Sequence, residues 1–222
     1  MERHFDDELA DVKKQIVEMA ARVEEMISLS IDALHNLDKN LARGVIGADK
    51  AIDEMEVEID EKCVDLMARF QPMAVDLRFL TMAMGITTDL ERIADLAVDI
   101  SQRVLELDGK PLLKPLVDIP RLTIIAREMV RDASDAFVRG DTELAGKVIR
   151  RDQEADQLRN LISDELTNDY MAKDPKTVPQ ALPLLLIARH LERICDHATN
   201  IAEEIIYMVQ ARMVRHHPEG LQ

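Results

Sequence analysis

The amino-acid sequence predicts an all-α protein built from two pseudo-symmetric three-helix bundles. Three observations indicate this fold: a helix-favouring composition, apolar residues spaced three and four apart, and an internal repeat. Apolar residues make up 47% of the 222 residues, whereas only seven Gly, four Phe, two Tyr and no Trp are present. The chain therefore lacks the turn-forming and aromatic residues of an all-β protein and is rich in residues that favour helices.

The first half of the chain is expected to form three long helices. The apolar spacing predicts them over about residues 6–40, 47–70 and 75–107. Gly44 and Gly47 mark the expected break between the first two, and Gln71-Pro72 ends the second. The segment 108–120 then holds three prolines and a glycine, as expected of a linker between two halves.

The second half repeats this pattern, with helices predicted over about residues 119–139, 141–171 and 179–213. The chain thus divides into a first bundle at residues 1–107, a linker at 108–118, and a second bundle with a short C-terminal tail at 119–222. Three long helices joined by short turns must pack antiparallel, up, down and up. We therefore expect two such bundles side by side.

The repeat is visible in two acidic segments. Residues 90–100 read LERIADLAVDI and residues 191–201 read LERICDHATNI, with seven of eleven positions identical. An offset of 103 aligns Asp49 with Asp152 and Asp53 with Asp156. After a two-residue deletion, an offset of 101 aligns Glu91 with Glu192. These matches indicate a duplicated three-helix unit.

The acids of the repeat have the spacing of a cation site. Glu91, Asp95 and Asp99 are four residues apart, which places three carboxylates on successive turns of one helix face. If the second and third helices of each half are neighbours, the aspartates of the second helix face this row across a groove. Oxygen ligands without thiolates suit magnesium, calcium, manganese or iron, and sometimes zinc. We therefore predict two metal sites, formed by Asp49, Asp53, Glu91, Asp95 and Asp99, and by Asp152, Asp156, Glu192, Asp196 and Asn200.

Other functions are less favoured. A single acidic pair at this spacing is expected by chance in so acidic a chain, so a solvated helix face is the simplest alternative for one pair. The Glu-x-x-His element of ferritin-like di-iron bundles is absent from both segments. His190 and His197 have no histidine counterparts in the first half, and an ordinary surface or groove role is expected for them. No phosphate loop or nucleophile elbow is present, so we predict no catalytic or cofactor-binding residues and no enzyme.

The charge of the chain restricts its partners. A net charge of −15 disfavours direct binding to nucleic acid or to anionic lipid and favours cations and basic protein surfaces. The N-terminal residues lack the apolar core of a signal peptide, and no apolar run reaches the length of a membrane span. We expect a cytoplasmic protein without membrane insertion.

The repeat, the two Glu-x-x-x-Asp segments and the sequence MEVEIDEKCVDLMARFQPMAVDLRFL at residues 55–80 together resemble the PhoU family of phosphate-transport regulatory proteins. The similarity extends over about residues 6–213. It implies multinuclear metal clusters at the acidic motifs, with iron or zinc favoured over magnesium or manganese. It also implies a negative regulator of the phosphate-starvation response that links the phosphate ABC transporter to a sensor histidine kinase, without catalytic activity.

Two further expectations concern assembly and the balance between the sites. The protein is expected to be a homodimer. Because Asn200 supplies an amide where Asp99 supplies a carboxylate, the second site is expected to bind fewer or weaker metals. A carboxylate-bundle protein for metal storage or metal-dependent oxidation is the alternative function, and a helical scaffold with solvated acids is the third.

Overall fold

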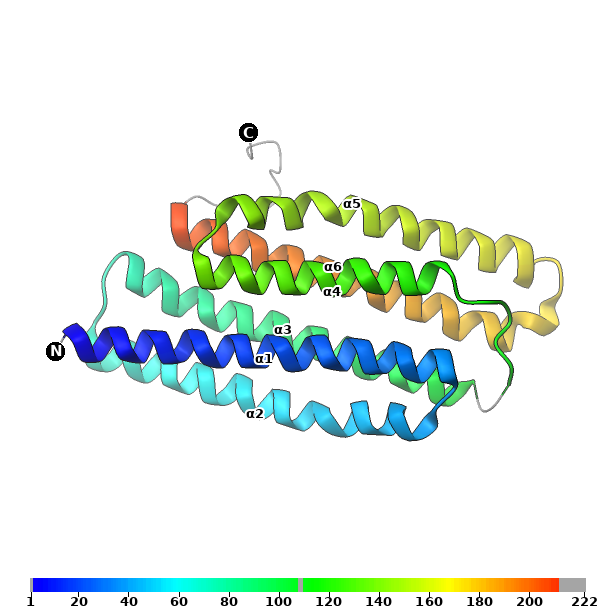
Figure 1. Ribbon diagram of the computed structural model, residues 1–222, viewed down its shortest axis with the longest axis horizontal. Coiled ribbons are helices and arrows are strands. Elements are labelled where there is room, and N and C mark those ends of the chain that lie inside the picture. The colour runs from blue at the N-terminus through cyan, green and yellow to red at the C-terminus, as the bar shows by residue number, and fades with distance from the viewer. Residues whose placement is uncertain (1, 108–109, 212–222) are drawn as a thin grey trace.

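Every regular element in the described part of the chain, residues 2–107 and 110–211 of a computed structural model, is a helix (Figure 1). The first half forms α1 (Glu2–Asn36), α2 (Lys39–Phe70) and α3 (Val75–Glu106). The second half forms α4 (Asp118–Arg139), α5 (Thr142–Asp164), the π-helix η1 (Glu165–Met171), the short 3-10 helix η2 (Pro175–Thr177) and α6 (Val178–Gln210). The predicted fold of two three-helix bundles is confirmed.

The two bundles lie side by side and share one hydrophobic core. Within each half all three long helices contact one another, and α3 packs against α6 while α1 packs against α4 (Figure 1). Ile93 of α3 and its repeat counterpart Ile194 of α6 are both fully buried in a single continuous cluster. The division into domains at residues 1–107 and 119–222 stays a prediction, because no break in the core separates the bundles.

The break predicted at Gly44 and Gly47 is wrong, because α2 begins at Lys39 and runs through both glycines. The chain turns earlier, where Leu37 adopts a left-handed φ of 51°. Asp38 then caps α2, since its side chain accepts hydrogen bonds from the backbone N–H groups of the residues two and three positions later, Asn40 and Leu41. The expected glycine is missing from this turn, so the sequence pattern placed the break too late.

The second half shows the same turn with the usual residue. Gly140, the counterpart of Leu37 in the repeat, has a φ of 63°, and Asp141 caps α5 as Asp38 caps α2. The helix predicted at residues 141–171 continues as expected but changes to π geometry after Asp164. The end predicted for the last helix is three residues too late: α6 ends at Gln210, and residues 212 and 213 lie outside the described range.

Candidate functional site

The first acidic cluster lies between α2 and α3, which pack side by side. Burial raises the pKa of Asp49, and the neighbouring charges of Asp53 on the same helix and Asp95 on α3 raise it further. Burial also raises the pKa of Glu91 to about 7, with Asp95 and Asp53 contributing and Arg92 opposing. The charges of Asp53 and Asp95 therefore raise the pKa of both Asp49 and Glu91, as expected of carboxylates that face one another across a groove.

Positive charge compensates this cluster only weakly. Arg92 Nε lies 3.4 Å from Glu91 Oε2, and Arg92 Nη1 lies 3.1 Å from Asp95 Oδ2. The arginine side chain is 56% exposed, so water screens both ion pairs. Glu91 Oε2 is nevertheless buried without a hydrogen bond, because the contact with Arg92 does not have hydrogen-bond geometry. A buried carboxylate oxygen without a donor is an energetically unfavourable group that a cation would stabilise.

The second acidic cluster has the same arrangement between α5 and α6. Burial raises the pKa of Asp152 to about 6, and Asp196, Asp156 and Glu192 add to the rise. Burial and the charges of Glu192 and Asp156 likewise raise the pKa of Asp196. Asp152 Oδ1 is buried without a hydrogen-bond partner, like Glu91 Oε2 in the first cluster.

The two clusters differ at one position of the repeat that the predicted sites did not include. In the second cluster, Arg159 Nη2 lies 3.1 Å from Glu192 Oε1 and 3.9 Å from Asp156 Oδ1. The counterpart of Arg159 in the repeat is Glu56, which accepts a hydrogen bond of 2.9 Å from the Thr88 hydroxyl. Glu56 also raises the pKa of Glu91. The repeat alignment contained this contrast between Glu56 and Arg159, but only the structure places both residues beside the predicted sites.

The third residue of each predicted row has its contact elsewhere, across the seam between α3 and α6. Asp99 Oδ2 lies 3.7 Å from His190 Nδ1 of the other bundle. Asn200 Nδ2 donates a hydrogen bond of 3.3 Å to Asp89 Oδ1, which also accepts one of 2.7 Å from His197 Nδ1. The role of Asp99 and Asn200 as metal ligands stays a prediction, and it would require each side chain to leave its contact at the seam.

The two four-acid clusters, without those third residues, fit a hard cation in their donor chemistry. Both consist of carboxylates only, and each contains a buried oxygen without a hydrogen bond. Among the described residues, however, no three His, Cys, Asp or Glu side chains converge closely enough to hold one ion. Binding would therefore need rotation of some of these side chains, several of which are exposed to solvent.

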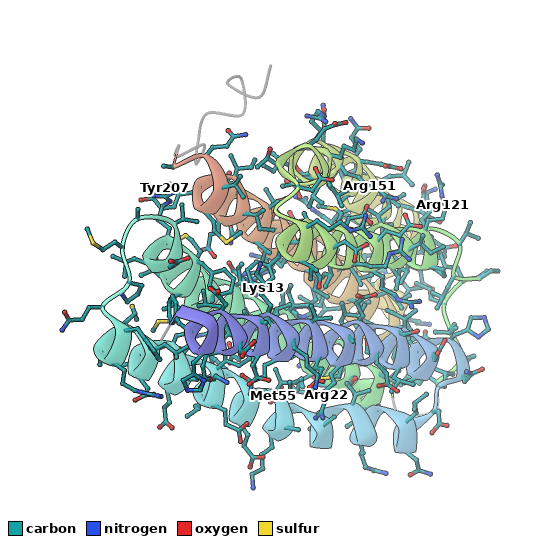
Figure 2. All side chains as sticks on the ribbon, turned by 60° about the vertical axis from the view of Figure 1, so that its left-hand side comes forward. Lys13, Arg22, Met55, Arg121, Arg151 and Tyr207 are labelled. Carbon is teal, nitrogen blue, oxygen red and sulfur yellow. The ribbon has the colours of Figure 1, made fainter. Side chains whose placement is uncertain are left out.

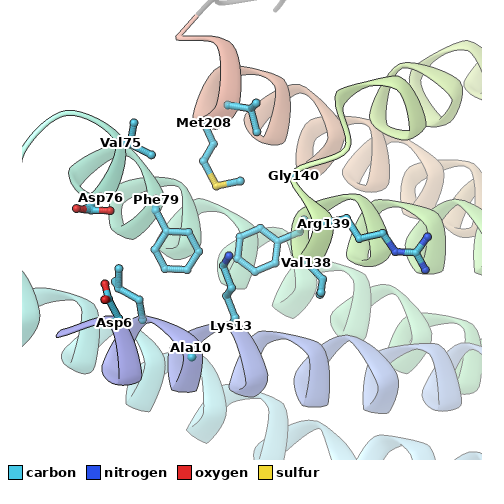
Figure 3. A pocket seen from close by; sticks show the side chains of 13 residues that line it. Asp6, Ala10, Lys13, Val75, Asp76, Phe79, Val138, Arg139, Gly140 and Met208 are labelled. Atoms are coloured by element: carbon cyan, nitrogen blue, oxygen red, sulfur yellow. The ribbon is translucent and has the colours of Figure 1, made fainter. Parts of the chain in front are cut away.

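The structure contains two larger hollows, of which one adjoins an acidic cluster. A mainly apolar one of about 460 Å³ lies where the ends of α1, α3, α4 and α6 meet, and Lys13 Nζ lies there 5.3 Å from the centre of the Phe79 ring (Figure 3). None of the predicted site residues lines it. A polar one of about 560 Å³ adjoins the second cluster and is lined by Arg159, Ser163, Leu185, Arg189, Glu192, Arg193 and Asp196.

The fold and the paired clusters define a class: duplicated three-helix bundles in which each half carries carboxylates between its second and third helices. A model of the PhoU domain matches the chain twice, at residues 16–104 and 119–205. The chain belongs to the PhoU family. No helix in the described part of the chain has the length and apolar character required to span a membrane.

Relatives and solved structures agree with this assignment. The chain is 40% identical over 209 residues to the phosphate-specific transport system accessory protein PhoU homolog of Aquifex aeolicus, covering 94% of each chain. It is 40% identical over 215 residues to the corresponding protein of Escherichia coli, covering 96% of this chain and 88% of that one. The crystal structure of PhoU from Pseudomonas aeruginosa matches with a TM-score of 0.89 at 36% identity, covering 94% of this chain and all of that one.

Proposed function

We propose that the protein is a non-enzymatic regulatory adaptor of phosphate uptake. The observation that carries this proposal is the match of both bundles to the PhoU domain, together with relatives named as phosphate-specific transport system accessory proteins. In this role the protein acts in the cytoplasm as a homodimer. It links the phosphate ABC transporter to its sensor histidine kinase and represses the starvation response when phosphate is plentiful.

Metal binding at the two acidic clusters forms the second part of the proposal. Asp49, Asp53, Glu91 and Asp95 would hold the first ion or ions, and Asp152, Asp156, Glu192 and Asp196 the second. Iron or zinc is favoured, and magnesium or manganese would suit the same oxygen donors. A bound cation would neutralise the clustered carboxylates and tie α2 to α3 and α5 to α6. The bundles would then present a more rigid surface to a partner protein.

The alternative of metal storage or metal-dependent oxidation has less support. Di-iron bundles of that kind place histidines beside their carboxylates. His190 and His197, which flank the second acidic segment, contact Asp99 and Asp89 at the seam between the bundles. Carboxylates alone are suited to hold a cation in a structural role, and we propose no reaction for this protein.

Metal analysis of a matched pair of variants tests the metal sites. The double variant Glu91→Gln/Asp95→Asn removes two charges from the first cluster with little change in side-chain size. Glu54→Gln/Glu58→Gln removes two charges at the same spacing from exposed positions of α2 and serves as the control. After loading with zinc or iron and desalting, the first variant should retain about half the metal of the wild type or less, and the control should retain all of it. Equal metal content in all three proteins would contradict the first site.

A genetic experiment tests the adaptor role separately. Deletion of the gene should derepress phosphate-starvation genes in cells grown with abundant phosphate, and the wild-type gene should restore repression. Unchanged expression after deletion would contradict the adaptor role. The variant Glu91→Gln/Asp95→Asn, introduced in place of the wild type, then shows whether repression depends on the first acidic cluster.

A further inference from the structure

The polar hollow beside the second cluster gathers positive charge in an otherwise acidic protein. Arg159 and Ser163 stand one turn apart on α5, and Arg189 and Arg193 stand one turn apart on α6. Three guanidinium groups thus line one cavity of about 560 Å³ in a chain whose net charge is −15. A cavity of this size has the volume of a small-molecule site.

Two of these arginines, Arg189 and Arg193, are not held in a close ion pair by any described residue. Within the described part of the chain, neither Arg189 nor Arg193 forms an ion pair, although the charge of Arg193 opposes the rise in the pKa of Asp196. Like charges four residues apart destabilise a helix by a few tenths of a kcal/mol. Both arginines are exposed, so their guanidinium groups are free to turn into the hollow. Such an arrangement is suited to an anion that pairs with both groups.

The first bundle shows that this charge is not a consequence of the duplication. The counterparts of Arg159, Ser163 and Arg189 in the repeat are Glu56, Asp60 and Thr88. Both acids accept hydrogen bonds from hydroxyl groups of α3, at 2.9 Å for Glu56 and 3.0 Å for Asp60. The equivalent surface is therefore acidic in one bundle and basic in the other.

The remaining arginines of the two bundles show the same contrast. Arg92 and its counterpart Arg193 each follow the glutamate of their acidic segment. Arg92 forms ion pairs with both Glu91 and Asp95, whereas no ion pair within the described residues involves Arg193. The guanidinium group that forms ion pairs in the first bundle forms none among the described residues in the second, where its charge only opposes the rise in the pKa of Asp196.

We propose that this hollow binds free inorganic phosphate in its hydrogenphosphate form. The guanidinium groups of Arg159, Arg189 and Arg193 and the hydroxyl of Ser163 would donate hydrogen bonds to its oxygens. Glu192 and Asp196 also line the hollow and accept hydrogen bonds but repel a bare anion. Hydrogenphosphate keeps one proton at neutral pH and can donate it to a carboxylate, whereas sulfate and a fully ionised phosphate ester cannot. Because an acceptor without a donor is unfavourable, the two acids select the protonated anion.

Titration calorimetry on the chelator-treated full-length protein tests this proposal without depending on metal. The variant Arg189→Thr introduces the residue of the first bundle, and Arg22→Thr removes one exposed charge from α1 in the other bundle as the control (Figure 2). At constant ionic strength the wild type should bind one phosphate. Arg189→Thr should bind it about 10-fold more weakly, because charge-assisted hydrogen bonds are lost. Arg22→Thr should change the dissociation constant by less than about 2-fold, since a distant exposed charge is screened.

Two further anions test the selectivity of the hollow. Sulfate and glycerol phosphate, measured at a pH where the ester is fully ionised, should each bind about 10-fold more weakly than inorganic phosphate. The variant Asp196→Asn should reduce the preference for phosphate over sulfate. Absence of phosphate binding, equal loss in Arg189→Thr and Arg22→Thr, equal binding of sulfate, or tighter binding of the ester would each overturn the proposal. Because metal is absent throughout, failure of this experiment leaves the metal clusters to be judged by their own test.

Discussion

The two bundles share a helical frame but differ in the charges placed on it. Both have the same capping aspartate at the start of their second helix and four carboxylates between their second and third helices. The first bundle adds Glu56 beside these acids, and the second places Arg159 among them, 3.1 Å from Glu192. Duplication thus repeats the position of the carboxylates, while one half-buried position beside them carries opposite charges in the two bundles.

The acid whose pKa is raised most lies on a different helix in each bundle. In the first it is Glu91 on α3, and in the second it is Asp152 on α5. In both cases burial is the largest cause and neighbouring carboxylates are the next. Arg159 pairs with Glu192, the counterpart of Glu91, and thereby provides a counter-charge where the first bundle has only exposed Arg92. The positions of the acids are repeated, but the acid whose pKa is raised most is at a different position in each bundle.

Exchanging the charges of Glu56 and Arg159 should have the largest effect on metal affinity. A cation that binds the second cluster must displace Arg159, so Arg159→Glu should raise the metal affinity of that cluster. Glu56→Arg should lower the metal affinity of the first cluster, because a cation would then have to displace an arginine there as well. We expect changes of about 10- to 100-fold in each direction, equivalent to about 1.4–2.8 kcal/mol. Competition titrations with a chromophoric chelator measure these affinities when the other cluster is disabled by Gln and Asn substitutions.

A control variant distinguishes the effect of a charge beside the second cluster from the effect of the net charge of the protein. Arg150→Glu makes the same change of charge at an exposed position of α5. Its effect on the second cluster should be below about 2-fold, because water and salt screen an exposed charge more strongly than that of the half-buried Arg159, which pairs with Glu192 directly. If Arg150→Glu strengthened binding as much as Arg159→Glu, the contrast between Glu56 and Arg159 would reflect net charge alone.

The helical fold could be predicted from the sequence because the apolar spacing and the repeat are long and consistent. The position of the turn between α1 and α2 could not, because Leu37 adopts the left-handed conformation that Gly140 adopts in the second half. A side chain in that conformation is unfavourable, and packing of the whole bundle maintains it. The Asp38 cap was readable, but two nearby glycines gave a stronger and misleading signal.

The candidate site could be predicted in part for a similar reason. Acids four apart on neighbouring helices must be close once the helices pack, so the four carboxylates of each cluster follow from spacing and the repeat. A residue eight positions along the helix is rotated by about 80° from the first, because each residue advances about 100°. Asp99 and Asn200 therefore face the other bundle, and the partner in that direction is set by the tertiary packing of α3 on α6.

The free energy of unfolding should depend on pH differently in the two bundles, with an effect smaller than that of the charge exchange. The pKa of Glu91 is raised from 4.5 to about 7 on folding, so the metal-free folded state binds its proton more tightly than the unfolded state. The contribution of Glu91 to the free energy of unfolding must then fall as pH rises from 4.5 to about 7. Relative to Glu91→Gln, the wild type should lose about 1 kcal/mol over this range, after allowance for solvent screening.

Urea unfolding of chelator-treated protein at several pH values measures this difference. Asp152→Asn should show its own difference from the wild type at lower pH, between 3.8 and about 6, because those are the unfolded and folded pKa values of Asp152. Parallel stability curves for the wild type and both variants would mean that the two carboxyls are not perturbed. A difference in the same pH range for both variants would remove the contrast between the bundles.

The smallest effect on metal binding is expected at the position where the sequence predicted the difference between the sites. If Asn200 were a weak ligand, Asn200→Asp would raise the affinity of the second cluster by about 10-fold or more. The amide instead donates to Asp89 across the seam, so a carboxylate there would lose that hydrogen bond and face a like charge. We expect less than about 2-fold change in metal affinity and a loss of about 0.5 kcal/mol in stability, moderated by His197, which also donates to Asp89.

Asp99→Asn is the matched variant on the other side of the seam, where it removes the charge facing His190. A large gain in metal affinity for Asn200→Asp would move this residue from the seam to the metal site and would make the asymmetry of the bundles a matter of ligand charge rather than of Arg159.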